Sequence, residues 1–148
     1  MMPQQHLPYH TIGSQARVNF LDRMYCCAKN QLGLVQVSEG PKIDHSGTYK
    51  VALATQGLDT SLKDEYQIQW MTACILSELA HLHESGFLHR DVRLPNILYI
   101  PPPTDSSNTV GTYVLIDFEH GGSANSATSS EDEMEVVDDP WLTQYIER

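Results

Sequence analysis

The sequence predicts a mixed α+β fold for one domain, and three observations support this prediction. Two segments carry apolar residues at gaps of three and four, which is the spacing of an amphipathic helix. Two pairs of β-prone runs are each separated by residues typical of turns. The chain has 148 residues, a length that normally makes one domain and buries roughly 70% of the surface exposed by its unfolded chain. One modest core fits this length, and two complete lobes do not.

The first helix is predicted to begin at Ser14, a residue that can cap a helix start. Its apolar residues recur on one side: Val18, Leu21, Tyr25, Ala28 and Leu32. Gly33 follows the last of them, at a place where helices often end. The segment therefore predicts one amphipathic helix that ends near Leu32.

A β-hairpin is predicted next. Residues 34–37 form an apolar run before Gly40-Pro41, and residues 48–55 form a second β-prone run. The residues between the runs include three that favour turns, which are Asp44, Ser46 and Gly47.

The second helix is predicted over residues 61–84. Its apolar stripe is unusually broad, because the main positions are widened by further apolar neighbours. The main positions are Ile68, Met71, Ile75, Leu79 and Leu82, and the neighbours are Ala73, Leu76 and Ala80. So wide an apolar face predicts a central, heavily buried helix.

A second strand pair follows this helix. Residues 97–100 and 113–116 are β-prone, and the turn-rich residues 101–111 separate them. Asp117 comes directly after the second run. We therefore expect its carboxylate at the end of a strand, where side chains project into clefts.

Two stretches carry the residues that indicate a chemistry. Residues 79–98 read LAHLHESGFLHRDVRLPNIL, and residues 114–119 read VLIDFE. They contain Asp91, Asn96 and Asp117, the first two in the spacing His-Arg-Asp-x-x-x-x-Asn. Phosphoryl transfer depends on positioning, on Mg²⁺ and on a carboxylate that accepts the proton of the attacking hydroxyl. One acceptor and two metal ligands are thus present in the right order.

These stretches resemble the catalytic loop and the metal-binding strand of the protein kinase superfamily. The resemblance covers about residues 14–121 and implies a partial kinase-like fold. It implies that Asp91 is the catalytic base, that Asn96 and Asp117 bind Mg²⁺ and ATP, and that Arg93 stands where kinases carry a lysine that reaches the γ-phosphate. Arg90 would pair with the Asp117 segment or with an activation-loop phosphate. The adenine would meet the backbone near residues 56–59.

The motif departs from the usual kinase pattern in two places. Val92-Arg93-Leu94-Pro95 replaces the common Leu-Lys-Pro-Glu, and Glu119 replaces the glycine of Asp-Phe-Gly. Glu119 is either a neutral variant or a residue that blocks the backbone freedom of glycine. With these departures the chain is most similar to divergent kinase-like proteins of fungi and oomycetes, including the Crinkler-associated group.

Several kinase elements have no counterpart in the sequence. Only 13 residues precede the first helix, which leaves no room for the strands of the Gly-rich loop and its phosphate-pairing lysine. Lys50 does not fit that role, because a single helix separates its strand from Asp91. The first helix offers only Asp22 as an acid, and the Ala-Pro-Glu signature and the later helices of the large lobe are missing. The chain resembles the middle of a kinase.

Two functions remain open. The first is an ATP- and Mg²⁺-dependent protein kinase of Ser/Thr type, with activity expected to be weak or absent because a lysine, its acid partner and the phosphate-covering loop are missing together. The second is a catalytically inactive pseudokinase, or kinase remnant, that binds a partner protein. A third possibility is that the chain is a fragment whose missing strands lie upstream.

Composition limits the partners and the compartment. The net charge is −10, and residues 131–139 contribute −6 of it, because they hold six acids and no Lys or Arg; the net acidity therefore belongs mainly to the tail. No basic cluster suits nucleic acid, and no apolar run is long enough to cross a membrane or to act as a secretory signal. The three cysteines cannot all pair within the chain and are typical of reduced thiols, so we expect an intracellular protein, cytoplasmic or nuclear. The absence of a Cys-x-x-Cys pair argues against a cysteine metal site.

The predicted organisation has three segments. Residues 1–13 form an N-terminal tail, residues 14–121 form the kinase-like domain, and residues 122–148 form an acidic, Ser-rich tail that we expect to be disordered. The tail ends in a short hydrophobic segment around Trp141 to Tyr145. Ser129 and Ser130 precede a run of acids and are candidates for phosphorylation.

Overall fold

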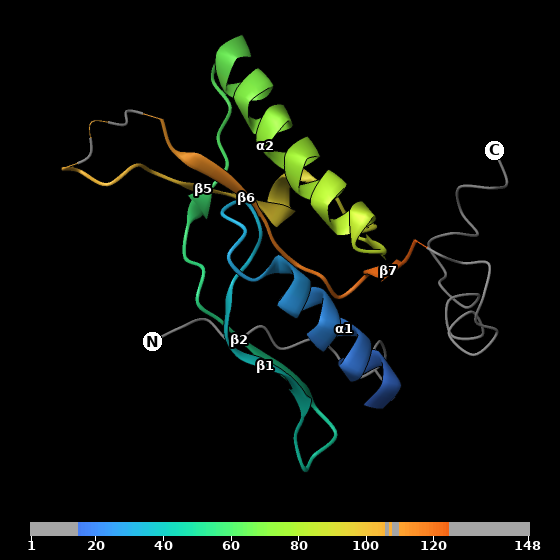
Figure 1. Ribbon diagram of the computed structural model, residues 1–148. Helices are drawn as coiled ribbons and strands as arrows, with labels where there is room; N and C mark the ends of the chain where they lie inside the picture. The colour runs from blue at the N-terminus through green and yellow to red at the C-terminus, as the bar shows by residue number, and fades with distance from the viewer. Residues whose placement is uncertain (1–14, 106, 108–109, 125–148) are drawn as a thin grey trace, which may run out of the picture.

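Two long helices and three small antiparallel sheets make up the residues that the computed structural model describes, which are 15–105, 107 and 110–124 (Figure 1). Helix α1 (Gln15–Ala28) packs beside β1 (Val37–Ile43), which pairs with β2 (Tyr49–Leu53). Helix α2 (Glu65–Glu84) packs on β6 (Thr112–Leu115). The α+β class predicted from the sequence is confirmed. Ser14, the predicted tail at residues 1–13 and residues 125–148 of the predicted tail at 122–148, which include Ser129 and Ser130, lie outside the described residues.

Helix α1 ends at Ala28, four residues before the predicted end. Asn30 has a φ of 66°, a left-handed conformation that stops a helix. The side chain of Gln36 then covers the helix end, because its Nε2 donates to the carbonyl oxygens of Ala28 and Gln31 at 2.7 and 3.0 Å. Leu32 is 84% exposed. The prediction that Leu32 belongs to the helix is wrong, because a side-chain amide satisfies the final carbonyl groups earlier.

The first hairpin is confirmed, although its first strand lies later than predicted. β1 continues through Gly40 and Pro41, where the register against β2 shifts. The turn forms at the predicted residues, since Asp44 Oδ1 accepts from the N–H groups of Ser46 and Thr48 at 2.9 and 3.0 Å. Gly47 has a φ of 80° that suits glycine.

The apolar residues just before β1 connect the two halves of the fold instead of entering the hairpin. Leu34 forms a parallel bridge with Leu115 of β6. The N–H of Val35 donates to the carbonyl of Leu115 at 3.0 Å, and the N–H of Leu115 donates to the carbonyl of Gly33 at 2.8 Å. These residues are buried. The segment therefore joins the α1 half of the fold to the α2 half.

Helix α2 begins at Glu65, four residues after the predicted start. Asp64 is the cap, since its Oδ1 accepts from the N–H of Gln67 at 2.8 Å. At the other end Gly86 has a φ of 87°, and its N–H donates to the carbonyl of His83 at 3.0 Å. The Asp-x-x-Gln spacing in the sequence is a signal of this start.

The prediction that α2 is heavily buried is wrong for the described chain. Ile75 and Leu82 are its buried residues. Ile68 is 48% exposed and Leu76 is 60% exposed. The apolar pattern is present, but β6 and β4 (Phe87–Leu88) meet only one side of the helix.

The second predicted hairpin is confirmed. β5 (Ile97–Ile100) pairs antiparallel with β6, and β3 (Leu58–Asp59) adds to the other edge of β5. β4 pairs antiparallel with β7 (Gly122–Ser123). This last pairing extends two residues beyond the domain boundary expected at Gly121.

One continuous core links both halves. The side chains with the least exposure come from α1, α2, the 34–35 segment, β6 and the turn that follows it. The largest of them are Phe118, Leu21, Met24, Leu34, Leu82 and Leu115. Phe118 lies directly after Asp117, so the packing of the core fixes the position of a predicted metal ligand.

We predict that Leu21→Ala lowers the free energy of unfolding by about 3 kcal/mol, because it leaves a cavity at a fully buried site. Leu32→Ala should change it by less than about 0.5 kcal/mol, because that side chain already contacts water. Urea denaturation of both variants measures the difference. Equal losses would contradict the helix end at Ala28.

Candidate active site

The loop that carries the predicted base is held by a buried histidine. The N–H of Asp91 lies 3.2 Å from His89 Nδ1, so Nδ1 must accept this hydrogen bond. His89 Nε2 then carries the ring proton and donates to the carbonyl of Ile116 at 2.9 Å. Burial lowers the pKa of His89, which keeps the ring neutral. One imidazole therefore connects the Asp91 loop to the strand end that precedes Asp117.

The carboxylate of Asp91 is oriented by its neighbours in the loop. Asn96 Nδ2 donates to Asp91 Oδ2 at 2.7 Å and to the Asp91 carbonyl at 3.0 Å. Arg93 Nε lies 3.1 and 3.2 Å from the two carboxylate oxygens. The structure thus brings together Asp91, Arg93 and Asn96, three of the four residues that the sequence selected.

The fourth residue, Asp117, lies next to this group. The N–H of Ile116 donates to the carbonyl of Asn96 at 2.9 Å, which ties the two segments together. Asp117 has a φ of 68°, and its Oδ1 is buried with no hydrogen-bond partner among the described residues. Burial raises the pKa of Asp117, and the negative charge of Asp91 raises it further. The two carboxylates are therefore close enough to interact.

The oxygen atoms of this group suit Mg²⁺. Both hydrogen bonds of the Asn96 side chain use its nitrogen, so its Oδ1 has no partner among the described residues. Together with Oδ1 of Asp117, which also lacks a partner in the described chain, this leaves two hard oxygen atoms available to a cation. No group of three or more His, Cys, Asp and Glu residues in the described chain is arranged to hold a metal. Mg²⁺ fits such a sparse site, because it takes its remaining ligands from water and from nucleotide phosphates.

Aromatic side chains pack next to the site. The ring of Phe118 stacks on Tyr25 of α1 at 4.9 Å and meets His89 edge-on at 5.6 Å. Burial raises the pKa of Tyr25, and nearby Tyr49 and Asp117 raise it further. Tyr25 was predicted only as a core residue of the first helix. Its helical spacing could not reveal that it lies near Asp117.

Glu119 is buried, which the sequence did not predict. It is 5% exposed, and neither carboxylate oxygen has a hydrogen-bond partner among the described residues. It is not among the non-glycine residues with a positive φ, so its backbone does not require glycine. Arg17 of α1 contacts this turn through the main chain, where its Nη2 donates to the carbonyl of Glu119 at 2.6 Å. An unpaired buried carboxylate destabilises a fold.

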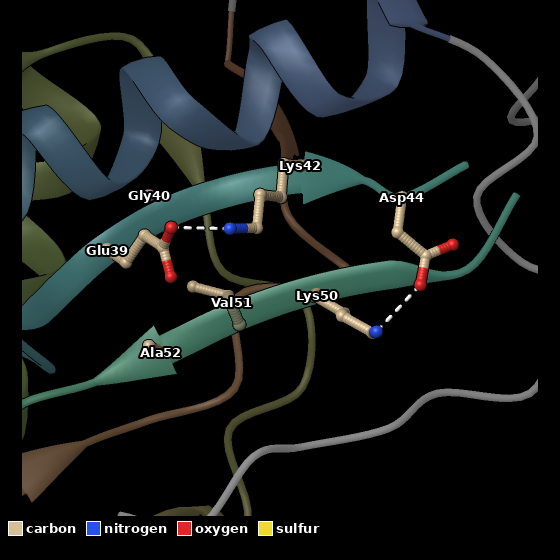
Figure 2. Close-up of a pocket in the computed structure, with 7 residues that line it drawn as sticks. All are labelled: Glu39, Gly40, Lys42, Asp44, Lys50, Val51 and Ala52. Carbon is tan, nitrogen blue, oxygen red and sulfur yellow. Dashed lines mark hydrogen bonds and ion pairs between the residues drawn. The ribbon is translucent and has the colours of Figure 1, made fainter. Parts of the chain in front are cut away.

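Two basic residues that the sequence analysis considered, Arg90 and Lys50, have structural contacts. The guanidinium of Arg90 lies against Gly122 of β7, where a Cβ would come within 2.3 Å of it. Lys50 forms an ion pair with Asp44 at 2.6 Å, as Figure 2 shows. A hollow of about 290 Å³ lies beside Lys50 on the β1–β2 hairpin (Figure 2). None of the four predicted site residues lines this hollow.

Comparison with known families adds no assignment, since no family model matches the chain. Within the described residues, neither α1 nor α2 is both long and apolar enough to span a membrane.

We predict that acidification destabilises the fold through His89. Its folded pKa lies below the ordinary value of about 6.5, so the unfolded chain binds the extra proton first and stability falls as the pH drops through that range. Protonation of Nδ1 would also remove the acceptor for the Asp91 N–H. Urea midpoints between pH 7.5 and pH 5 should therefore fall more steeply for the native chain than for His89→Gln. Parallel pH profiles would exclude this role, because the other six histidines are common to both chains.

We predict that Asp117→Asn raises the melting temperature by a few degrees at pH 7. Burial raises the folded pKa of Asp117, so the folded chain favours the protonated acid and loses stability as the pH rises through that pKa. Asparagine resembles the protonated form. The increase in melting temperature should disappear as the pH falls below about 3.9, the ordinary pKa of aspartate. A lower melting temperature for Asp117→Asn at pH 7 would show that the ionised form is compensated.

Proposed function

We propose that this chain binds Mg²⁺ and ATP at Asp91, Asn96 and Asp117 and that the site supports phosphoryl transfer to a protein hydroxyl of Ser/Thr type. The observation that carries the proposal is the oriented carboxylate of Asp91 beside the unpartnered, buried oxygen of Asp117. An oriented acceptor and an oxygen ligand next to each other are what this reaction requires.

Each residue has one role in this proposal. Asp91 accepts the proton of the substrate hydroxyl, whose oxygen attacks the γ-phosphorus while ADP leaves. Asn96 orients Asp91 through its nitrogen and offers Oδ1 to the metal, and Asp117 offers Oδ1, which none of the described residues contacts by a hydrogen bond. Mg²⁺ would neutralise charge on the phosphates. Arg93 contributes positive charge next to Asp91.

The proposed fold relationship is to the protein kinase superfamily. The order of the described elements supports it: a helix, a hairpin, a long helix, the Asp91 loop, a second hairpin and Asp117. This is the order of a kinase from its regulatory helix onward. The packing of Phe118 between α1 and His89 is a further support.

We expect the rate of transfer to be low. Lys50 is engaged with Asp44, and Asp22 is the one acid in α1. No lysine–glutamate pair therefore lies between α1 and the β1–β2 hairpin in the described chain to hold the phosphates. Loss of one charge-stabilising donor alone costs on the order of 10² to 10³ in rate.

A second candidate function is a non-catalytic module that binds a partner protein. The exposed apolar residues of α2 favour it, because large uncovered apolar surfaces commonly mark interaction sites. Under either function we propose an intracellular protein, since Cys26, Cys27 and Cys74 are all free thiols.

Nucleotide binding is tested by thermal shift with Mg²⁺ and ATP. A ligand that binds only the folded chain raises the melting temperature, so we expect an increase that needs both Mg²⁺ and ATP and that Asp117→Asn abolishes. Glu119→Gln is the matched control, because it also neutralises a buried, unpartnered carboxylate but leaves the proposed ligands intact. A shift of equal size in both variants would remove Asp117 from the site.

Catalysis is tested separately with radiolabelled ATP and a mixture of protein acceptors. Asp91→Ala should lower the transfer rate by about 10² to 10⁴, as expected for loss of a general base. Asp105→Ala, at an exposed aspartate of the 101–111 turn, should retain the native rate. Binding of Mg²⁺ and ATP without any Asp91-dependent transfer would select the non-catalytic module.

A further inference from the structure

One side of α2 presents an exposed stripe with little polarity. Ile68, Thr72, Leu76 and Ala80 follow one another at intervals of four, which places them in one row along the helix. All four are exposed, with Ile68 at 48% and Leu76 at 60%. In Figure 1 one long side of α2 is turned away from the sheets. We call this row the α2 stripe.

The composition of α2 differs from that of an ordinary solvent-facing helix. From Tyr66 to Ser77 the sequence contains no Asp, Glu, Lys or Arg. The solvent face of α1, by contrast, carries Asp22 and Arg23. The same chain therefore uses charge on one exposed helix face and omits it on the other. This difference makes the α2 stripe a candidate docking surface for an apolar segment.

The last described residue lies at the C-terminal end of α2, so the residues that follow it in the sequence start there. The N–H of Ala124, the last described residue, donates to the carbonyl of Gly86 at 2.8 Å, and Gly86 lies just after the C-terminal end of α2. Residues 125–140 can reach about 50 Å when extended. Helix α2, with 20 residues, is about 30 Å long. Any point on the α2 stripe is within reach of the residues that follow.

Those residues have matching chemistry. Trp141, Leu142, Tyr145 and Ile146 fall on one side of a helical period and give an apolar face without charge. The six acids of residues 131–139 precede them. Arg90, which lies against Gly122, is exposed near the end of the described chain.

We propose that residues 141–146 pack on the α2 stripe of the same chain. This contact covers Ile68 and Leu76 with apolar side chains. It is independent of nucleotide binding and holds under either proposed function.

Fluorescence of Trp141 tests the contact in the full chain. Trp70→Phe leaves Trp141 as the single tryptophan, because the sequence has two. We expect emission shifted to the blue and acrylamide quenching several-fold weaker than for free tryptophan. Adding Leu76→Ser should restore quenching, and adding Leu58→Ser, at a leucine of β3 that is 59% exposed, should not. Quenching at the free rate in a folded chain, shown by circular dichroism, would overturn the proposal.

A thermal double-mutant cycle gives a second readout with native Trp70. Leu76→Ser and Trp141→Ser should each lower the melting temperature by a few degrees, and the double variant should fall no further than the larger single loss. Additive losses would show that the two residues do not touch. Protection that decreases on dilution, with a dimer in sedimentation, would assign the stripe to a second copy and overturn packing within one chain.

Discussion

The imidazole of His89 is the contact on which the site depends. Its two nitrogens bind the N–H of Asp91 and the carbonyl of Ile116, residues that are far apart in the sequence. Phe118 packs against the same ring and against α1. The positions of both aspartates are therefore set by the hydrophobic core, and a change in the packing of α1 is transmitted to the candidate metal ligand.

The site also contains buried carboxylates whose negative charge destabilises the fold. The half-buried carboxylate of Asp117 has one unpartnered oxygen and faces the charge of Asp91, and Glu119 is buried without a partner in the described chain. Groups that reduce stability in this way are typical of functional sites, because a cation that binds there recovers the cost. A purely structural turn would have little reason to keep two such acids. The unfavourable charge is the strongest physical argument for a cation at this place.

Much of the architecture could be predicted from local patterns. The spacing of Asp91 and Asn96 anticipated their contact, and the turn residues around Asp44 anticipated the first hairpin. The end of α1 could not be predicted, because the amide of Gln36 reaches back eight residues to Ala28. The exposure of α2 could not be predicted either, since periodicity reports which side of a helix is apolar and not whether another surface meets it. The unpartnered oxygen of Asp117 depends on the packing of several segments, which no single stretch of sequence contains.

The most direct test of the account replaces Mg²⁺ by paramagnetic Mn²⁺, which accepts the same oxygen ligands, and follows the NMR signals of the full chain with ATP. The account predicts that the signals of Asp91, Asn96 and Asp117 broaden together, including the side-chain amide of Asn96. Broadening confined to the acidic residues 131–139, with the signals of these three residues unchanged, would show that the two aspartates do not form a shared metal–nucleotide site.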